Sequence, residues 1–184
     1  MPIFNGGVNK EVYLTAHVRD IVRIPPDRMG EPLEEVSLSI LNQKYSGLYD
    51  KELGIIIGVY NVKVDPLGKI IPNDGATYHN VEMDLISYKP FIHEVVEGPV
   101  VDVKSFGIFV RIGPIDGFVH KSQISDEYVE YDPTRPGFIL KDSRKIIEMG
   151  DIVRARIVGI STGSEREGIR VQLTMRQPYL GRIG

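Results

Sequence analysis

The sequence of 184 residues predicts an α+β chain made of two small domains, the first mixed and the second all-β. Hydrophobic residues make up 42% of the chain, which is enough to form folded cores. The 19 Gly and 12 Pro residues favour short strands and turns over long helices. One segment in the first half has the spacing of an amphipathic helix, whereas the second half shows strand patterns.

The first predicted strand and the helix follow from two different periodicities. Apolar and polar residues alternate from Tyr13 to Ile24, which indicates a strand with one buried face. A helix is expected over residues 32–45, where apolar side chains recur on one face: Leu33, Val36, Ile40 and Leu41. Residues 1–12 precede this pattern, and we expect them to be a tag or a variable extension.

Two further strands complete an N-terminal domain over residues 13–95. An Ile- and Val-rich segment at residues 53–64 predicts a buried strand. Alternation over residues 77–88 predicts a strand with one face more exposed to solvent than the other. Between them, residues 65–75 contain two turn signals rich in Asp, Pro, Asn and Gly. They predict a glycine-rich tip at one end of a small α+β domain.

The second half, residues 96–184, is expected to be all-β, with the domain boundary near residues 94–99. Five short strands with Gly-containing turns are expected at residues 100–104, 106–112, 118–120, 151–161 and 169–175. This number of strands is typical of the OB fold, a five-stranded Greek-key barrel. Residues 125–149 are long for a loop, so an ordered insertion at the barrel rim is expected there.

Composition and charge exclude several classes of protein. The chain has no Cys, which excludes a disulfide framework and thiolate metal sites. It has no apolar run long enough to span a bilayer and no secretory signal pattern, so a cytoplasmic location is expected. Residues 96–184 carry 13 basic and 12 acidic side chains, so bulk charge does not predict non-specific polyanion binding.

Motifs for catalysis and cofactor binding are missing from the sequence. It contains no GxxxxGK phosphate loop and no GxSxG elbow. His93-Glu94 begins a zinc-protease motif, but the second His is absent. The four His residues, at positions 17, 79, 93 and 120, have no metal-ligand spacing. We therefore expect no catalytic residue, no metal site and no cofactor.

The strand at residues 106–112 is the most informative segment. Alternation turns three apolar side chains inward and leaves Phe109 and Arg111 on the outer face. Phe106 lies at the start of the strand, beside Gly107. Two exposed rings on a barrel suit single-stranded nucleic acid, because every base has a face that can stack. From spacing alone, rings that only cover an apolar patch or the insertion are an equally good interpretation.

Other side chains of the predicted barrel also have two interpretations. Phe118 follows a tight turn and is placed in the core. His120 could stack on a base or bind a phosphate, although a capped polar residue at a strand end is the simpler interpretation. Arg154 shares a face with Arg156, and Arg170 shares one with Gln172, as pairs that could clamp a sugar–phosphate backbone. For Arg154 the preferred interpretation is an ion pair with an acidic neighbour: Asp151, Glu165 or Glu167.

Several short motifs occur in a fixed order over residues 96–178. They are Glu97-Gly98, Phe106-Gly107-Ile108-Phe109-Val110, Gly117-Phe118-Val119-His120, Ser122, Gly150-Asp151-Ile152-Val153 and Leu173-Thr174-Met175-Arg176. Together they resemble the ribosomal-protein-S-one motif, an OB-fold family of RNA-binding modules. The resemblance implies RNA contacts by two aromatic residues, a His and a basic residue of the last strand: Phe106, Phe109, His120 and Arg170. Ser161 stands where that family often has an acidic or amide residue.

The expected RNA-binding set also includes Lys121, next to His120, and Arg156 on the fourth strand. The insertion at residues 125–149 exceeds the minimal motif of the family.

Four longer segments point to a narrower family. They are Val22-Arg23-Ile24-Pro25-Pro26, Asp50-Lys51-Glu52-Leu53-Gly54-Ile55, the run from Gly68 to Tyr78, and the run from Phe109 to Gly117. They resemble the archaeal RNA polymerase subunits called E-prime, whose eukaryotic counterpart is the seventh subunit of RNA polymerase II. The resemblance covers residues 13–182.

This second resemblance implies a role in transcription. The N-terminal domain would be a truncated ribonucleoprotein-like fold whose tip contacts the polymerase core through Leu53, Gly54, Gly68, Lys69, Pro72 and Gly75. The small helical F protein of the polymerase would pair with the chain along the join of its domains. The heterodimer would form a stalk beside the RNA exit path, bind nascent single-stranded RNA and assist promoter opening.

Two other functions are compatible with the sequence. The chain could be a free-standing RNA-binding protein of translation or RNA decay, using the same barrel, or an enzyme whose barrel delivers substrate. The segment at residues 53–78 separates the first alternative from a polymerase subunit, and the missing catalytic motifs count against the second.

Overall fold

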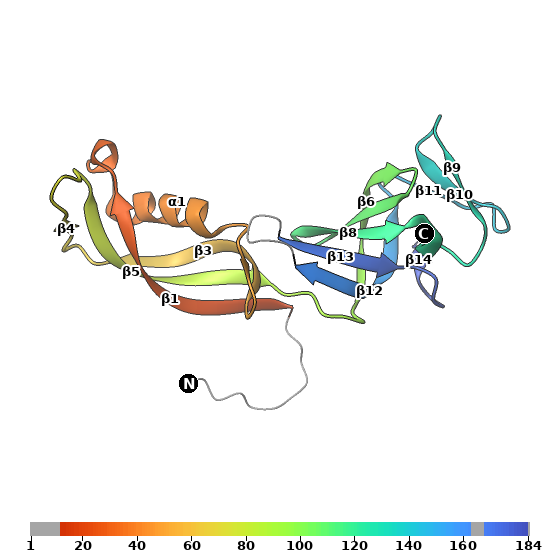
Figure 1. Cartoon of the computed structure of the whole chain (residues 1–184), viewed down its shortest axis with the longest axis horizontal. Coiled ribbons are helices and arrows are strands. Elements are labelled where there is room, and N and C mark those ends of the chain that lie inside the picture. The colour runs from red at the N-terminus through yellow and green to blue at the C-terminus, as the bar shows by residue number, and fades with distance from the viewer. Residues whose placement is uncertain (1–11, 163–167, 184) are drawn as a thin grey trace, which may run out of the picture. The chain divides into compact units, whose positions relative to one another are not determined.

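The computed structural model describes residues 12–162 and 168–183, so the predicted extension at residues 1–12 lies almost wholly outside the described residues. The chain divides into two compact units, Met1–Lys89 and Pro90–Gly184. Figure 1 shows one helix in the first unit and a group of strands in the second. Each unit has its own hydrophobic cluster, which agrees with the two cores expected from the sequence.

The N-terminal unit is an antiparallel sheet with one helix on one face (Figure 1). Its elements are β1 (Tyr13–Ile24), the 3-10 helix Pro26–Arg28, α1 (Leu33–Tyr45), β2 (Tyr49–Asp50), β3 (Gly54–Val64), β4 (Lys69–Ile70) and β5 (Thr77–Tyr88). The strand order is β1-β5-β3-β2, and the short β4 pairs with β5. The three long strands and the helix follow the predicted order, whereas the two-residue strands β2 and β4 are additions.

Alternation along β1 and β5 explains how the sheet and the helix form one core. Val22 and Ile24 of β1 and Met83 of β5 are nearly inaccessible to solvent and face α1. All four apolar residues that predicted the helix face pack in this cluster: Leu33, Val36, Ile40 and Leu41. The other face of the sheet is more polar and more exposed, because it carries the alternate residues of the same strands.

The predicted tip forms at the end of the N-terminal unit where β5 begins. Asp74 accepts hydrogen bonds from the guanidinium of Arg23 at 2.6 and 2.9 Å and from the hydroxyl of Tyr78 at 2.6 Å. The buried ring of His79 bonds the carbonyl of Asp65 at 2.9 Å. A Cβ added at Gly68 would lie 2.6 Å from the His79 ring, so Gly is required for this close approach.

Leu53 and Gly54 do not belong to this tip, which corrects the sequence-based expectation. Gly54 starts β3 and pairs with Asp50, whereas Val64, at the other end of β3, leads into the tip. Eleven residues of strand separate the two ends, a span of about 35 Å at ~3.3 Å per residue. The expected single contact surface therefore divides into two separate places.

The second unit is a closed five-stranded barrel of the OB type. Its strands are β6 (Val95–Lys104), β7 (Gly107–Ile112), β8 (Ile115–His120), β12 (Ile152–Thr162) and β13 (Ile169–Thr174), and β14 (Gly181–Arg182) pairs with β12. The order β13-β8-β7-β6-β12 closes through a β12–β13 pairing, and only the β13–β8 contact among these is parallel. The five-stranded OB prediction is confirmed.

The units divide between Lys89 and Pro90, a few residues before the boundary expected from strand periodicity. The reason lies in the backbone of the connecting segment. His93 donates to the carbonyl of Ile157 at 2.8 Å, and Ile157 donates to the carbonyl of Glu94 at 2.9 Å. This segment therefore joins the barrel before β6 begins at Val95.

Residues 125–149 form a small antiparallel sheet at the barrel. It consists of β9 (Val129–Asp132), β10 (Gly137–Leu140) and β11 (Ile146–Glu148), and a 3-10 helix, Lys121–Gln123, precedes it. Phe138, Leu140 and Ile147 are buried in the same hydrophobic cluster as the barrel strands. The insertion is thus part of the barrel core, not a peripheral loop.

Candidate nucleic-acid interface

A groove lined by three aromatic rings lies on the outside of the barrel. It has a volume of about 450 Å³ and combines Phe106, in the turn before β7, with residues of β7, β8, β12 and β13: Phe109, Asp116, Phe118, Ser161, Ile169, Arg170, Val171 and Gln172. Phe106 is 49% exposed, and Phe109 and Phe118 are half-buried. The insertion at residues 125–149 contributes no residue to this lining.

The rings contact one another in a row. The ring centroid of Phe118 lies 5.7 Å from that of Phe106 and 5.2 Å from that of Phe109, and both pairs are tilted. Such offset pairs are favourable and hold the rings in place. A Cβ added at Gly107 would lie 2.7 Å from the Phe118 ring and 2.3 Å from the carbonyl oxygen of Val119. Gly107 therefore allows β8 to approach β7 closely beneath Phe106.

Phe118 lies in the groove and not in the core, which corrects the sequence-based placement. β7 and β8 pair with Ile112 opposite Ile115, so Gly113-Pro114 is the two-residue turn between them. Counting outward from this turn puts Phe118 directly opposite Phe109. Directly opposite residues of an antiparallel pair share a face. A turn placed at residues 113–114 would have identified Phe118 from the sequence.

His120 borders the groove, and among the described residues its Nε2 has no hydrogen-bond partner. Its ring centroid lies 6.3 Å from that of Phe118 in an edge-on arrangement. Its Nδ1 accepts a hydrogen bond from the backbone N–H of Ser122 at 3.2 Å. Since a backbone N–H can only donate, Nδ1 is the unprotonated nitrogen of the neutral ring and Nε2 carries the hydrogen. Nε2 is therefore available as a donor to a phosphate or a base carbonyl.

Two polar side chains of β13 point into the groove, in agreement with the prediction that both lie on the same side of the strand. Arg170 and Gln172 are both exposed and both line it. Among residues 12–162 and 168–183, neither the Arg170 guanidinium nor the Lys121 ammonium has an ion-pair partner. Asp116 is the one acidic side chain among the described residues that line the groove, and Arg111 binds its carboxylate. The groove therefore keeps a cation available for a phosphate.

Three of the expected RNA-binding residues, His120, Lys121 and Arg156, do not line the groove, and of these Arg156 is the one that lies far from it. It lies five positions before Ser161 on β12, about 16 Å along the strand. The side chain is half-buried, and its Nε has no hydrogen-bond partner among the described residues. Its neighbour Arg154 forms an ion pair, as expected, but with Glu97 at 2.6 Å. Asp151 pairs with Arg182 instead, and Glu165 and Glu167 lie outside the described residues.

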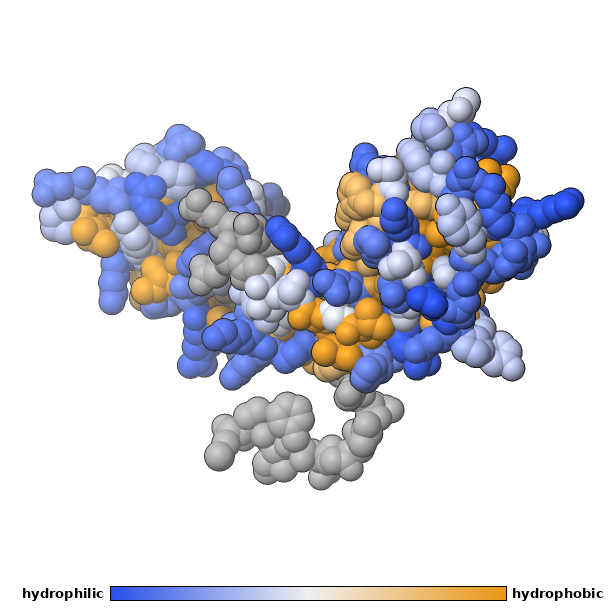
Figure 2. Space-filling view, turned by 45° about the vertical axis from the view of Figure 1, so that its right-hand side comes forward, coloured by the Kyte–Doolittle hydropathy of each residue, from blue (hydrophilic) through white to orange (hydrophobic). Residues whose placement is uncertain are grey.

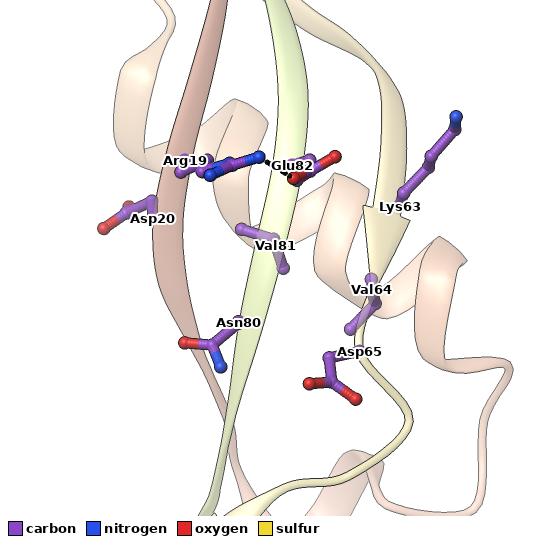
Figure 3. A pocket seen from close by; sticks show the side chains of 8 residues that line it. All are labelled: Arg19, Asp20, Lys63, Val64, Asp65, Asn80, Val81 and Glu82. Carbon is purple, nitrogen blue, oxygen red and sulfur yellow. Dashed lines mark ion pairs between the residues drawn. The ribbon is translucent and has the colours of Figure 1, made fainter.

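The N-terminal sheet also has a hollow, of about 480 Å³, where β1, β5 and β3 lie side by side (Figure 3). Arg19 reaches Glu82 across the sheet at 2.7 Å, and Lys63 extends away from the other labelled side chains. On the same open face, His17 bonds Asp84 at 2.8 Å. Lys63 has no ion-pair partner among the described residues, whereas the Arg19, Glu82, His17 and Asp84 side chains are paired within the protein. No aromatic ring of the described residues lines the hollow.

In the parts of the chain that the structure describes, no three His, Asp or Glu side chains are grouped to hold a metal ion. Among the same residues, no helix has the length and apolar character to cross a membrane.

Fold and groove together define a two-unit protein whose OB barrel carries aromatic rings in an outer groove. Residues 19–75 match the family model described as "SHS2 domain found in N terminus of Rpb7p/Rpc25p/MJ0397". Residues 89–176 match the model described as "S1 RNA binding domain".

Curated relatives extend over nearly the whole chain. DNA-directed RNA polymerase subunit Rpo7 of Saccharolobus shibatae is 45% identical over 172 residues, which cover 94% of this chain and 96% of the relative. DNA-directed RNA polymerase II subunit rpb7 of Schizosaccharomyces pombe is 29% identical over 177 residues, again 94% and 96% of the two chains. The chain belongs to the Rpo7/Rpb7 family of DNA-directed RNA polymerase subunits.

Proposed function

We propose that this chain is a non-catalytic stalk subunit of DNA-dependent RNA polymerase that binds nascent single-stranded RNA and assists promoter opening. The groove of three aromatic rings carries the RNA-binding part of this proposal. Family membership over 94% of the chain supports the polymerase part. A free-standing protein of translation or RNA decay is not favoured, because residues 19–75 match a domain described for polymerase-subunit relatives.

In the proposed mechanism, the groove takes RNA bases one beside another without reading their sequence. Phe106 and Phe109 offer ring faces, and Phe118 supports both from beneath. Arg170 and Lys121 neutralise phosphates, and His120 donates from Nε2. A stacked base is worth about 1–3 kcal/mol and depends little on its identity. Sequence-tolerant binding suits a transcript whose sequence changes continuously.

The tip supplies the proposed contact with the polymerase core. Leu67, Ile70 and Ile71 are 80%, 73% and 47% exposed, and apolar atoms reach the surface at the β4 end of this unit (Figure 2). Gly68, Lys69, Pro72 and Gly75 lie among them. Exposed apolar groups on an ordered loop favour a protein contact. We restrict this contact to the tip and leave out Leu53 and Gly54.

The small helical F protein of RNA polymerase is the proposed partner in a heterodimer, and the cytoplasm of an archaeal-type cell is the proposed location. Both rest on the family. Co-expression with a candidate F protein, followed by a mass measurement in solution, tests the pairing: a one-to-one complex is expected, and two separate species would contradict it.

Two measurements test the function itself. The purified chain should bind a fluorescent single strand of RNA in preference to a duplex of the same length, because only unpaired bases expose both faces. Equal binding of the two would contradict stacking. Used as bait in an extract, the tagged chain should recover polymerase subunits, and Ile70→Ser should reduce this recovery while leaving RNA affinity unchanged. Recovery of ribosomal or nuclease components without polymerase would favour the alternative.

A further inference from the structure

A second depression lies beside the groove, between the barrel rim and the insertion. Its volume is about 510 Å³, and it is lined by Lys121, Ser122, Ser125, Asp126, Glu127, Tyr128, Val129 and Arg176. Ligand sites typically measure about 300–1,000 Å³. Tyr128 is 73% exposed, so its ring presents a large free surface there.

His120 joins this depression to the aromatic groove. On one side its ring meets the edge of Phe118, which lines the groove. On the other side its Nδ1 lies 2.8 Å from the hydroxyl of Ser122, which lines the depression. The backbone N–H of Lys121 donates to the carbonyl of Phe106 at 2.9 Å. This bond connects a residue that lines the depression with one that lines the groove. A strand that leaves the groove past His120 therefore enters the depression directly.

The two carboxylates of the depression are already engaged by other groups, which leaves one of its two cations without an ion-pair partner. Asp126 accepts from the Nε of Arg176 at 2.7 Å, so each neutralises the other. Glu127 accepts from the backbone N–H groups of Asp142 and Ser143 at 3.1 and 2.8 Å. Lys121 is exposed and has no ion-pair partner among the described residues. A free cation beside a free aromatic ring is the combination that binds a nucleotide of a single strand.

A backbone hydrogen bond fixes the position of Tyr128 next to the insertion sheet. Its carbonyl accepts from the N–H of Lys141 at 3.1 Å, and Val129, the next residue, starts β9. The sheet that contains β9 is anchored in the barrel core through Phe138 and Ile147. A ring whose backbone is held next to an anchored strand loses less freedom when it stacks on a base than a ring on an unanchored segment does.

We propose that the insertion extends the RNA path, with Tyr128 as a further stacking surface and Lys121 as the phosphate contact between the groove and the depression. This inference rests on the proposed function, since it concerns the same single-stranded RNA. It assigns a role to residues 125–149, which the minimal S-one motif lacks. It also implies that the length of RNA bound exceeds what the groove alone can hold.

The test compares Tyr128→Ala with the unaltered chain on RNA strands of two lengths. A strand of about four nucleotides fills the groove alone, and one of about twelve reaches the depression, within the site sizes known for OB folds. Tyr128→Ala is expected to weaken binding of the long strand about five-fold or more and to leave the short strand unchanged. Tyr128→Phe keeps the ring and should bind both strands like the unaltered chain.

Tyr179→Ala is the matched control, because Tyr179 is 92% exposed on the same unit and lines neither the groove nor the depression. Unchanged binding of the long strand by Tyr128→Ala would overturn the inference, and so would an equal loss on both strands. Weak binding of both strands by the unaltered chain would instead remove the proposed RNA-binding function, and this inference with it.

Discussion

The open face of the N-terminal sheet and the groove face of the barrel are both outer faces of β-strands, but their polar side chains are paired to different extents. On the sheet, Arg19 is bound to Glu82, and Asp84 accepts from both His17 and Asn61. In the groove, the described contacts leave Arg170 and the Nε2 of His120 unpaired, beside exposed rings. Satisfied charges stabilise a surface, whereas unpaired ones are available to a ligand.

The largest expected effect is on RNA affinity in the groove. Phe109→Ala removes one stacking ring and should weaken binding of single-stranded RNA about ten-fold or more. Because Phe109 is half-buried and outside the core cluster, the melting temperature should change little. A matched change on the sheet, Arg19→Ala, should leave the affinity unchanged. Unfolding of the barrel by Phe109→Ala, with normal affinity in the folded fraction, would contradict the assignment.

A loss of stability without a loss of RNA affinity is expected when a charge that links the helix to the sheet is removed. Asp20 of β1 accepts from Lys44 at 2.6 Å and from Tyr45 at 2.7 Å, both at the end of α1. Burial raises the pKa of Asp20, but these bonds outweigh it and the pKa is lowered. Asp20→Ala should cost about 1 kcal/mol of unfolding free energy in this unit, measured by denaturant titration. The affinity for RNA should stay the same. A loss of affinity in this variant would contradict our claim that the N-terminal sheet and the barrel groove act independently.

A smaller effect concerns salt. The groove and its edge provide few free cations, so few counterions are released when RNA binds. A log–log plot of affinity against salt concentration should have a slope of about −1 to −3, at ~0.7 per phosphate neutralised on a single strand. Lys121→Ala should reduce that slope by about one phosphate contact. A slope steeper than about −5 would show that phosphate contacts, not stacking, dominate.

The smallest effect is expected on acidification, where the two units should differ. In the N-terminal unit, the Arg23 guanidinium and the Tyr78 hydroxyl hold the pKa of Asp74 well below its usual range, and backbone N–H groups lower the pKa of Asp50. Carboxyls with a lowered pKa in the folded state stabilise it above their ordinary value, near ~4, and this stabilisation is lost as the pH falls through the folded value.

Within the described part of the barrel unit, Asp132 is the carboxyl that shows such a lowered pKa, because of the backbone N–H of Thr134. The N-terminal unit should therefore lose stability sooner below about pH 4. Amide signals followed by NMR in the intact chain would measure this order. Earlier loss of the barrel signals would contradict it.

The sequence was sufficient where a local period decides the structure. Alternation from Tyr13 to Ile24 defines β1, and the apolar spacing from Leu33 to Leu41 defines α1, because each depends only on which face is buried. The OB prediction followed from strand number and turn residues.

The sequence was insufficient where pairing register decides the structure. Phe118 belongs to the groove because a two-residue turn sets it opposite Phe109, and strand alternation alone does not locate that turn. Gly54 and Gly68 are both glycines at strand ends, yet the length of β3 separates them. A bulge between Ile157 and Gly159 shifts the pairing of β12, so spacing on that strand did not show how far Arg156 lies from the groove.

The most direct test of the central claim separates stacking from simple apolar coverage. Phe109→Leu keeps an apolar side chain of similar reach but removes the ring, whereas Phe109→Tyr keeps the ring. We expect Phe109→Tyr to bind single-stranded RNA as the unaltered chain does, and Phe109→Leu to bind about five-fold or more weakly at an unchanged melting temperature. Equal affinity of both variants would mean that the rings only cover an apolar patch, and the proposed stacking of RNA bases on them would be wrong.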